Sequence, residues 1–324
     1  MSKALSPQSG KGVTNEVALI AGPTASGKSH YAVALAQQLA ARGQEAVIIN
    51  ADSAQVYQDL LILSARPDET EMASIPHKLF GEWDGAVACS AADWAKAARA
   101  EISAAHSAGI LPILVGGTGL YIRTLLDGIA PIPPIDDTIR DDIRAMRVED
   151  AYQALEREDP ERAEFLNPAD ATRVKRALEV VRSTGHPLLY WQQHRTGGIG
   201  DHVALFPLIL LPEREWLYSR CNMRLTAMME NGAIAEVERL LDRNLSPALP
   251  VMRAIGVQEI ARFLRQELDF EESLSAAQQA TRNYAKRQYT WFRRQPPADW
   301  KRTEDNNYPN GLEFETLLLR LGLT

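Results

Sequence analysis

Short apolar runs alternate with amphipathic stretches over the first 126 residues. Residues 17–21, 46–49 and 111–115 are apolar runs of the length expected for strands that are buried on both faces. Residues 28–39 have the apolar spacing of a helix, and 91–108 are also expected to be helical. Because strands alternate with helices, the sequence predicts an α/β fold whose parallel-sheet core is covered by helices on both faces.

The alternation stops after Leu126, where the character of the chain changes. A proline-rich segment, 131–134, opens a charged and helical stretch that continues to about His194. We therefore expect an inserted all-helical domain, after which an apolar strand at 203–211 returns the chain to the core. Three more helices are expected, over 213–229, 232–243 and 273–294.

The predicted domain organisation follows from this change and from the length. A chain of 324 residues suggests two domains. We expect a P-loop catalytic core over 17–126 and 203–324, an inserted helical domain over 127–202, and a flexible N-terminus over 1–16.

Composition narrows the class of protein. The two cysteines have no CxxC pairing, which argues against a disulfide framework and a zinc site. The polar first 16 residues lack the apolar stretch of a signal peptide, and no apolar run is long enough to cross a bilayer. The sequence therefore predicts a soluble cytoplasmic protein without a membrane partner.

Charge is unevenly distributed along the chain. The net charge of -7 argues mildly against a nucleic-acid partner, because polyanions usually bind basic proteins. However, residues 282–302 carry seven basic side chains against one acidic, and residues 173–195 carry five against one. These runs are either solvated helix faces or local sites for a polyanion.

Residues 22–29, GPTASGKS, match the P-loop pattern GxxxxGK[ST] between a predicted strand and helix. In such a loop, backbone N–H groups at a helix N-terminus face phosphate oxygens. Lys28 neutralises phosphate charge, and the Ser29 hydroxyl can bind Mg²⁺. ATP, GTP or another diphosphate would fit. The predicted phosphate-binding residues are Gly22, Pro23, Thr24, Ala25, Ser26, Gly27, Lys28 and Ser29.

Further candidate residues follow the other predicted strands. Asp52 and Thr118 come after the second and third strands, so they are expected at the same edge of the sheet as the P-loop. Asp52 could bind Mg²⁺, cap a helix or remove a proton, and Thr118 could donate to a phosphate or end a strand. Arg220 and Arg224 are four residues apart on a predicted helix, either as a diphosphate clamp or as solvated side chains.

Five motifs in this order resemble the bacterial tRNA dimethylallyltransferase family, also called IPP transferases. They are GPTASGKS at 22, DSAQVY at 52, LVGGTGLY at 114, RAIGVQE at 253 and AKRQYTWFR at 285. The resemblance covers about residues 17–295. Three positions depart from the family pattern, namely Arg66, Lys78 and Val257, and arginine for lysine at 66 keeps the charge but changes the donor geometry.

The resemblance implies an activity and assigns roles. The family transfers a dimethylallyl group from dimethylallyl diphosphate to N6 of adenosine 37 in tRNA and releases diphosphate. Asp52 would be the general base, and Thr118 would stabilise the bridging oxygen of the diphosphate. Lys28, Ser29 with Mg²⁺, and Arg224 would hold the leaving diphosphate.

The resemblance also implies which residues contact the anticodon stem-loop. By similarity these are Asp52, Ser53, Ala54, Gln55, Thr118, Arg140, Thr172, Arg173, Val174, Lys175, Arg176, Arg253, Ala254, Ile255, Gly256, Val257 and Gln258. We expect the protein to act as a monomer.

Other functions stay open from the residues alone. A P-loop small-molecule kinase shares the sheet and phosphate loop, but it needs a clamp for a transferred phosphoryl group. A P-loop RNA-binding switch would bind tRNA without changing it. A prenyltransferase acting on free AMP would share the core, but it does not need the large insertion or its basic run.

Overall fold

The structure is a computed structural model that describes residues 15–304, 316–317 and 319–321. Most of the N-terminal segment that was expected to be flexible therefore lies outside the described residues. Glu16, which was included in that segment, is the first residue of strand β1 (Glu16–Ala21). The predicted boundary was wrong here, because Glu16 already pairs with the neighbouring strand at Ala204.

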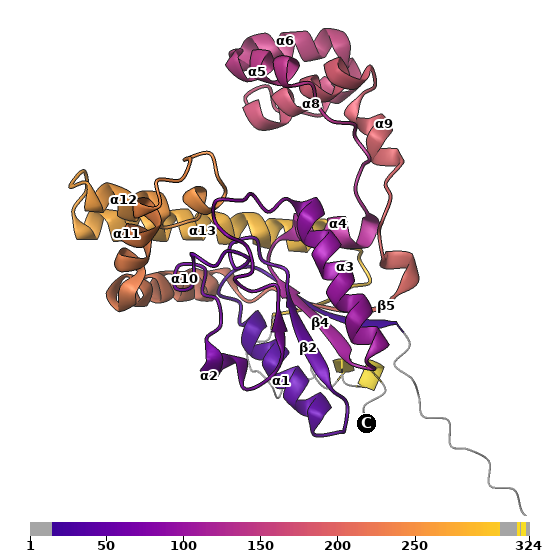
Figure 1. Cartoon of the computed structure of the whole chain (residues 1–324), viewed down its shortest axis with the longest axis vertical. Helices are drawn as coiled ribbons and strands as arrows, with labels where there is room; N and C mark the ends of the chain where they lie inside the picture. The colour runs from indigo at the N-terminus through magenta and orange to yellow at the C-terminus, as the bar shows by residue number, and fades with distance from the viewer. Residues whose placement is uncertain (1–14, 305–315, 318, 322–324) are drawn as a thin grey trace, which may run out of the picture. The chain divides into compact units, whose positions relative to one another are not determined.

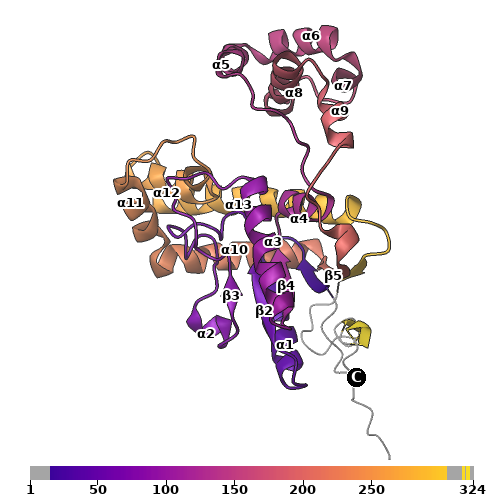
Figure 2. The same ribbon diagram turned by 45° about the vertical axis from the view of Figure 1, so that its right-hand side comes forward.

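Within the described residues, the core is a six-stranded parallel sheet with the order β3-β2-β4-β1-β5-β6 (Figures 1 and 2). This arrangement confirms the predicted α/β class. The strands that follow β1 are β2 (Ala46–Asn50), β3 (His77–Lys78), β4 (Leu111–Gly116), β5 (Ala204–Leu210) and β6 (Lys301–Thr303). The sequence did not predict the two short edge strands, β3 and β6.

The helices around the sheet come from both ends of the chain. The first group comprises α1 (Lys28–Ala40), α2 (Glu69–Met72), α3 (Ala91–Ser107) and α4 (Gly119–Asp127). The second group comprises α10 (Arg214–Met228), α11 (Ile234–Asp242), α12 (Val257–Leu264) and α13 (Phe270–Arg294). Short helical turns lie at Gly200–His202, Met229–Ala233 and Val251–Arg253.

Several helices of unit 1 differ from the prediction, and α2 and α4 were not predicted. Helix α13 begins at Phe270 rather than at residue 273, because Asp269 and Glu272 form a reciprocal capping box there. Helix α12 was not predicted as a helix. It is only eight residues long, and it begins after Gly256, which has a φ of 94°.

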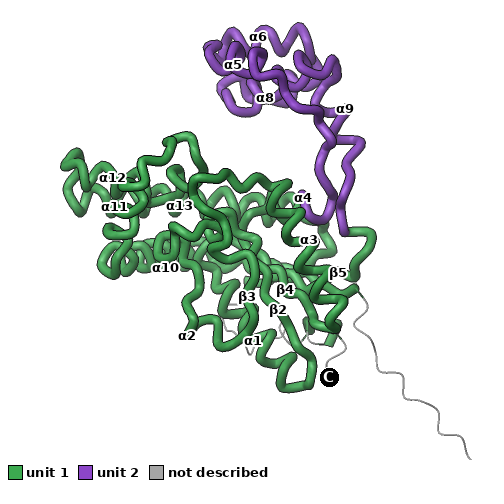
Figure 3. The backbone as a smooth tube through the Cα atoms, in the orientation of Figure 1, with its two compact units in different colours: residues 1–123, 200–324 green, residues 124–199 purple. Residues whose placement is uncertain are grey.

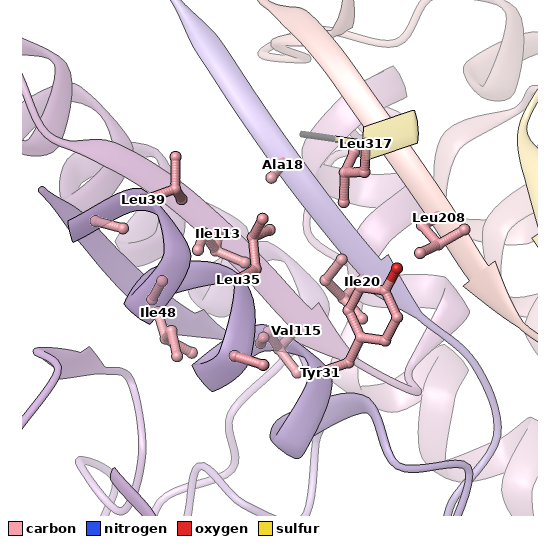
Figure 4. Close-up of a cluster of buried hydrophobic side chains, with 14 of the residues drawn as sticks. Ala18, Ile20, Tyr31, Leu35, Leu39, Ile48, Ile113, Val115, Leu208 and Leu317 are labelled. Carbon is pink, nitrogen blue, oxygen red and sulfur yellow. The ribbon is translucent and has the colours of Figure 1, made fainter. Parts of the chain in front are cut away.

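The core shows why the strands are apolar throughout. On one face of the sheet, Ala18, Ile20 and Ile48 pack with Leu35 and Leu39 of α1 (Figure 4). The intervening residues of the strands, such as Leu19 and Leu114, are equally buried, and α3 packs against β2 and β4. Burial on both faces places the functional groups at the ends of the strands rather than along them.

The chain divides into two compact units (Figure 3). Unit 1 comprises 1–123 and 200–324, and unit 2 comprises 124–199, where the sequence analysis placed an insertion at 127–202. Unit 2 contains α5 (Asp137–Ala145), α6 (Val148–Glu158), α7 (Pro160–Glu164), α8 (Ala171–Thr184) and α9 (Leu188–Gln193). Ile143, Leu155 and Leu178 are fully buried in a core that belongs to this unit alone.

Candidate active site

The P-loop connects β1 to α1, as the motif predicts. Gly22 has a φ of 156°, and a Cβ atom there would lie 2.5 Å from the backbone oxygen of Leu210. Only glycine therefore lets the loop leave β1 beside β5. Helix α1 begins at Lys28, so the first-turn N–H groups of this helix, which have no partner within it, lie at the loop. This geometry provides the N–H donors and the positive helix end that an anionic phosphate needs.

Lys28 is held inside the loop, and its pKa is lowered. Its ammonium group donates to the carbonyl oxygen of Pro23 at 2.8 Å. The pKa of Lys28 is lowered from 10.5 to about 8, chiefly by burial, while the nearby Asp52 raises this pKa and Arg224 lowers it. Burial likewise lowers the pKa of Arg224. Two desolvated cations that repel each other form a site that an anion would stabilise.

Helix α10 brings two arginines to this loop. Arg224 donates to the Thr24 hydroxyl, and Arg220 donates from Nε to the carbonyl oxygen of Ala25 at 3.3 Å. The Arg220 guanidinium also lies over the Trp216 ring, 4.8 Å from its centroid. The spacing of four residues therefore places both cations on the P-loop, where Arg224 is partly buried and Arg220 remains exposed.

Asp52 and Thr118 lie at the same edge of the sheet. The Asp52 carboxylate accepts a hydrogen bond from the backbone N–H of Ala54 at 3.0 Å, so it partly caps the turn that follows β2. The Thr118 hydroxyl accepts from the backbone N–H of Ser53 at 2.9 Å and donates to the Ser53 hydroxyl at 3.2 Å. These bonds join the turns after β2 and β4.

Tyr284 of α13 completes this cluster, and the sequence analysis did not single it out. Burial, together with the negative charge of Asp52, raises the pKa of its hydroxyl, and the neighbouring side chains of Thr118 and Ser53 lower this pKa by a smaller amount. The phenol therefore stays protonated and can act as a hydrogen-bond donor. Tyr284 lies within the basic run 282–302, where the sequence-based prediction used only the charged side chains.

Two cavities meet beside Asp52. The first has a volume of about 530 Å³, and its lining includes the P-loop residues Thr24, Ala25, Gly27, Lys28 and Ser29, with Arg220 and Arg224. The second has a volume of about 310 Å³ and is largely apolar and aromatic. Its apolar and aromatic lining includes Tyr57, Leu60, Leu63, Tyr121, Leu225, Met228 and Tyr284. Thr24, Asp52, Ser64 and Arg224 line both cavities, so a carboxylate and a cation lie where an anionic and an apolar chamber join.

The turn at residues 61–65, which contributes to the lining of both chambers, is held by the buried carboxylate of Glu236. Glu236 of α11 accepts backbone N–H groups from Leu61 and Ile62 at 2.8 Å each and from Leu63 at 2.9 Å. From the other side, the Gln55 side chain donates to the carbonyl oxygens of residues 64 and 65 at 3.0 and 2.8 Å. No local sequence pattern identifies Glu236, because an exposed helical glutamate has the same neighbours along the chain.

The comparisons with known proteins agree with this geometry. The model of the IPP transferase family matches residues 55–295, and that of isopentenyl transferase matches residues 15–81. The tRNA dimethylallyltransferase of Erythrobacter litoralis is 66% identical over 301 residues, covering 93% of this chain and 95% of that protein. That of Novosphingobium aromaticivorans is 65% identical, covering 86% and 99% respectively.

The chain belongs to the IPP transferase family. Solved structures agree with this assignment. A full-length tRNA isopentenylpyrophosphate transferase from Bacillus halodurans is 31% identical and has a TM-score of 0.68, covering 95% of this chain and 96% of that one. A eukaryotic dimethylallyltransferase acting on tRNA is 28% identical and has a TM-score of 0.73, covering 86% and 70%.

These findings confirm that the chain is an enzyme of prenyl transfer, and they support this function over that of a small-molecule kinase or an RNA-binding switch. Helices long and apolar enough to cross a membrane are absent from the described part of the chain.

The segment of this IPP transferase at 253–258 divides into two parts. Arg253, Ala254 and Ile255 line the apolar cavity. Val257 is fully buried, and the Gln258 side chain donates to the carbonyl oxygen of Met252 at 2.7 Å. The first part is available to a ligand of that cavity, whereas the side chains of the second part hold the turn before α12.

The RNA contacts expected in unit 2 are exposed to different degrees. Thr172, Arg173 and Arg176 are exposed on α8, whereas the Val174 side chain is fully buried in the core of the unit. Lys175 donates to the carbonyl oxygens of Arg144 and Met146 at 2.9 and 2.6 Å, which caps the end of α5. Arg140 on α5 is paired with Asp137 at 2.7 Å.

Proposed function

We propose that this IPP transferase moves a dimethylallyl group from dimethylallyl diphosphate to N6 of adenosine 37 in tRNA. The bond between N6 and the allylic carbon forms as the bond between that carbon and the diphosphate oxygen breaks. The N6 proton passes to Asp52, and diphosphate leaves. The observation that carries this proposal is the junction of a cationic P-loop chamber with an apolar chamber at Asp52.

The P-loop chamber suits the leaving group. Lys28 and Arg224 are desolvated cations whose charges disfavour each other, so a diphosphate relieves their repulsion. Their charge also stabilises the negative charge that develops on the departing oxygen. Thr118 would donate to the bridging oxygen by turning its hydroxyl hydrogen from the Ser53 hydroxyl, to which it donates in the structure, toward the diphosphate.

Mg²⁺ would be held by Ser29 together with oxygens of the diphosphate. Ser29 lines the P-loop chamber, and the described part of the chain contains no cluster of three or more His, Cys, Asp or Glu side chains that could hold a metal. Mg²⁺ commonly uses one or two protein ligands and completes its shell with substrate phosphates and water, so this sparse donor set fits. The ion would supply further charge neutralisation for the leaving diphosphate.

The apolar chamber suits the target base. A base in the anticodon loop must leave its stack before an enzyme can reach its exocyclic amine. Tyr57 and Tyr121 offer aromatic faces in this chamber, and Arg253 and Arg287 add charge. The Asp52 carboxylate lines the same chamber, where it can take a proton from an amine.

Label transfer tests the proposal directly. Incubation with labelled dimethylallyl diphosphate and unmodified tRNA that carries adenosine 37 should give Mg²⁺-dependent labelling of that base. Absence of transfer, or transfer to a tRNA whose position 37 is not adenosine, would contradict it. ATP should bind more weakly than dimethylallyl diphosphate in a competition assay.

Substitution of Asp52 tests the general base. Asp52→Asn keeps an oxygen that can accept from the Ala54 N–H but cannot take a proton, so kcat should fall by about 10² to 10⁴ without loss of stability. A loss of less than threefold would reduce Asp52 to a structural cap.

A further inference from the structure

Gln288 of α13 forms hydrogen bonds to two loops of the active site at once. Its carboxamide oxygen accepts from the backbone N–H of Thr24 at 2.8 Å, and its carboxamide nitrogen donates to the carbonyl oxygen of Gly117 at 2.9 Å. Thr24 belongs to the P-loop after β1, and Gly117 belongs to the turn after β4. The Gln288 side chain is buried, so water cannot replace either bond.

The fit of Gly117 against Gln288 shows how specific this arrangement is. A Cβ atom on Gly117 would lie 2.3 Å from the Gln288 carboxamide nitrogen and 3.0 Å from the carbonyl oxygen of Gly22. The absence of a side chain at 117 therefore allows the carboxamide to reach both loops.

The two residues that Gln288 holds are adjacent to groups used in the proposed reaction. Arg224 donates to the Thr24 hydroxyl, so Thr24 is fixed through its backbone by α13 and through its side chain by α10. Gly117 directly precedes Thr118, whose hydroxyl is hydrogen-bonded to Ser53. One carboxamide therefore joins the P-loop that lines the diphosphate chamber to the turn that carries the Thr118 hydroxyl.

We propose that Gln288 is a positioning residue that sets the separation between the P-loop and the Thr118 turn, so that both can engage one diphosphate. It acts through Thr24 and Gly117 rather than on the substrate. This role rests on the proposed function, since it needs a diphosphate that contacts both loops.

Binding of inorganic diphosphate and of tRNA to the full chain separates this role from a structural one. Gln288→Met keeps a side chain of similar length and removes both hydrogen bonds. We expect the dissociation constant for diphosphate to rise about tenfold, as for the loss of roughly 1.4 kcal/mol. The dissociation constant for tRNA should change by less than twofold, and the thermal midpoint by only a few degrees.

Two further variants sharpen the experiment. Gly117→Ala should reproduce the loss of diphosphate affinity, because the added methyl group displaces the same carboxamide. Gln38→Met, on the exposed face of α1, is the matched control and should leave both affinities unchanged.

Either of two results would overturn the proposal. Unchanged diphosphate binding by Gln288→Met would exclude a positioning role. Equal losses of diphosphate and tRNA binding with a large fall in the thermal midpoint would reduce Gln288 to a residue that only stabilises the fold. Failure of the wild-type protein to transfer label would instead contradict the proposed function, while the diphosphate measurement would still test Gln288.

Discussion

Arg224 donates a hydrogen bond to the hydroxyl of Thr24, although 200 residues separate the two in the sequence. The same guanidinium lines both the P-loop chamber and the apolar chamber. A planar group with several fixed donors can hold Thr24 and still offer N–H groups to an anion. Arg224 therefore connects the P-loop, which is proposed to bind the leaving diphosphate, to the junction where the bond would break.

Arg224→Lys should weaken diphosphate binding by about tenfold although it keeps the charge. An ammonium group is a point charge that lacks the planar fork, so it cannot hold the Thr24 hydroxyl and pair with two phosphate oxygens at once. Titration calorimetry with inorganic diphosphate measures the effect. Arg239→Lys, on the exposed face of α11, serves as the control. Equal affinities of the wild type and Arg224→Lys would show that charge alone matters at this position.

The lowered pKa of Lys28 should make stability depend on pH in a defined window. Its pKa falls from 10.5 to about 8 on folding, chiefly because of burial. Between these values the unfolded chain binds more protons than the folded one, so stability should rise as pH increases from 8 to 10.5. Relative to Lys28→Met, the wild type should gain on the order of 1 to 3 kcal/mol over this window. Urea unfolding of both proteins at several pH values tests this, and parallel profiles would contradict the assignment.

Glu236→Gln should destabilise the protein by about 1 to 3 kcal/mol, since three backbone N–H groups share the two oxygens of this buried carboxylate. The glutamine side chain has one acceptor oxygen, and its NH₂ group would face a backbone N–H group, which is also a donor. Urea unfolding measures the loss, and Glu238→Gln on the exposed face of the same helix is the control. The turn from 61 to 65 also lines both chambers, so turnover should fall together with stability. Equal stabilities of the two variants would argue against an anchoring role.

The sequence predicted the part of the site that depends on local patterns. A P-loop has a fixed spacing, and Asp52 and Thr118 could be placed beside it because parallel strands end at one edge of the sheet. Gln288 and Glu236 could not be found in this way. Each acts on a loop more than 170 residues away in the sequence, and nothing local distinguishes a buried helical glutamine or glutamate from an exposed one.

The RNA contacts expected in α8 show a second limit of prediction from sequence. Residues 172–176 were carried over as one block from a family resemblance, but a helix turns successive side chains to different faces. Val174, Ala177 and Leu178 are spaced as a buried helical stripe and lie in the core of unit 2. The periodicity of the sequence could have separated these residues from their exposed neighbours.

Arg173 and Lys175 should therefore respond differently to substitution. The Arg173 side chain is 73% exposed and makes only a 3.5 Å contact with Asp170, so its charge is available to a phosphate. Arg173→Ala should weaken tRNA binding a few-fold and reduce the slope of log K against log salt by somewhat less than one, without a change in thermal midpoint.

Lys175→Met should instead lower stability, because the ammonium group of Lys175 is already used by two carbonyl oxygens at the end of α5. Loss of this cap should cost about 1 kcal/mol, and the salt slope should stay within error of the wild type. Thermal unfolding and tRNA binding at several salt concentrations measure both effects. A reduced salt slope for Lys175→Met with unchanged stability would contradict this prediction. It would mean that Lys175 leaves the carbonyl oxygens of α5 and contacts a tRNA phosphate when tRNA binds.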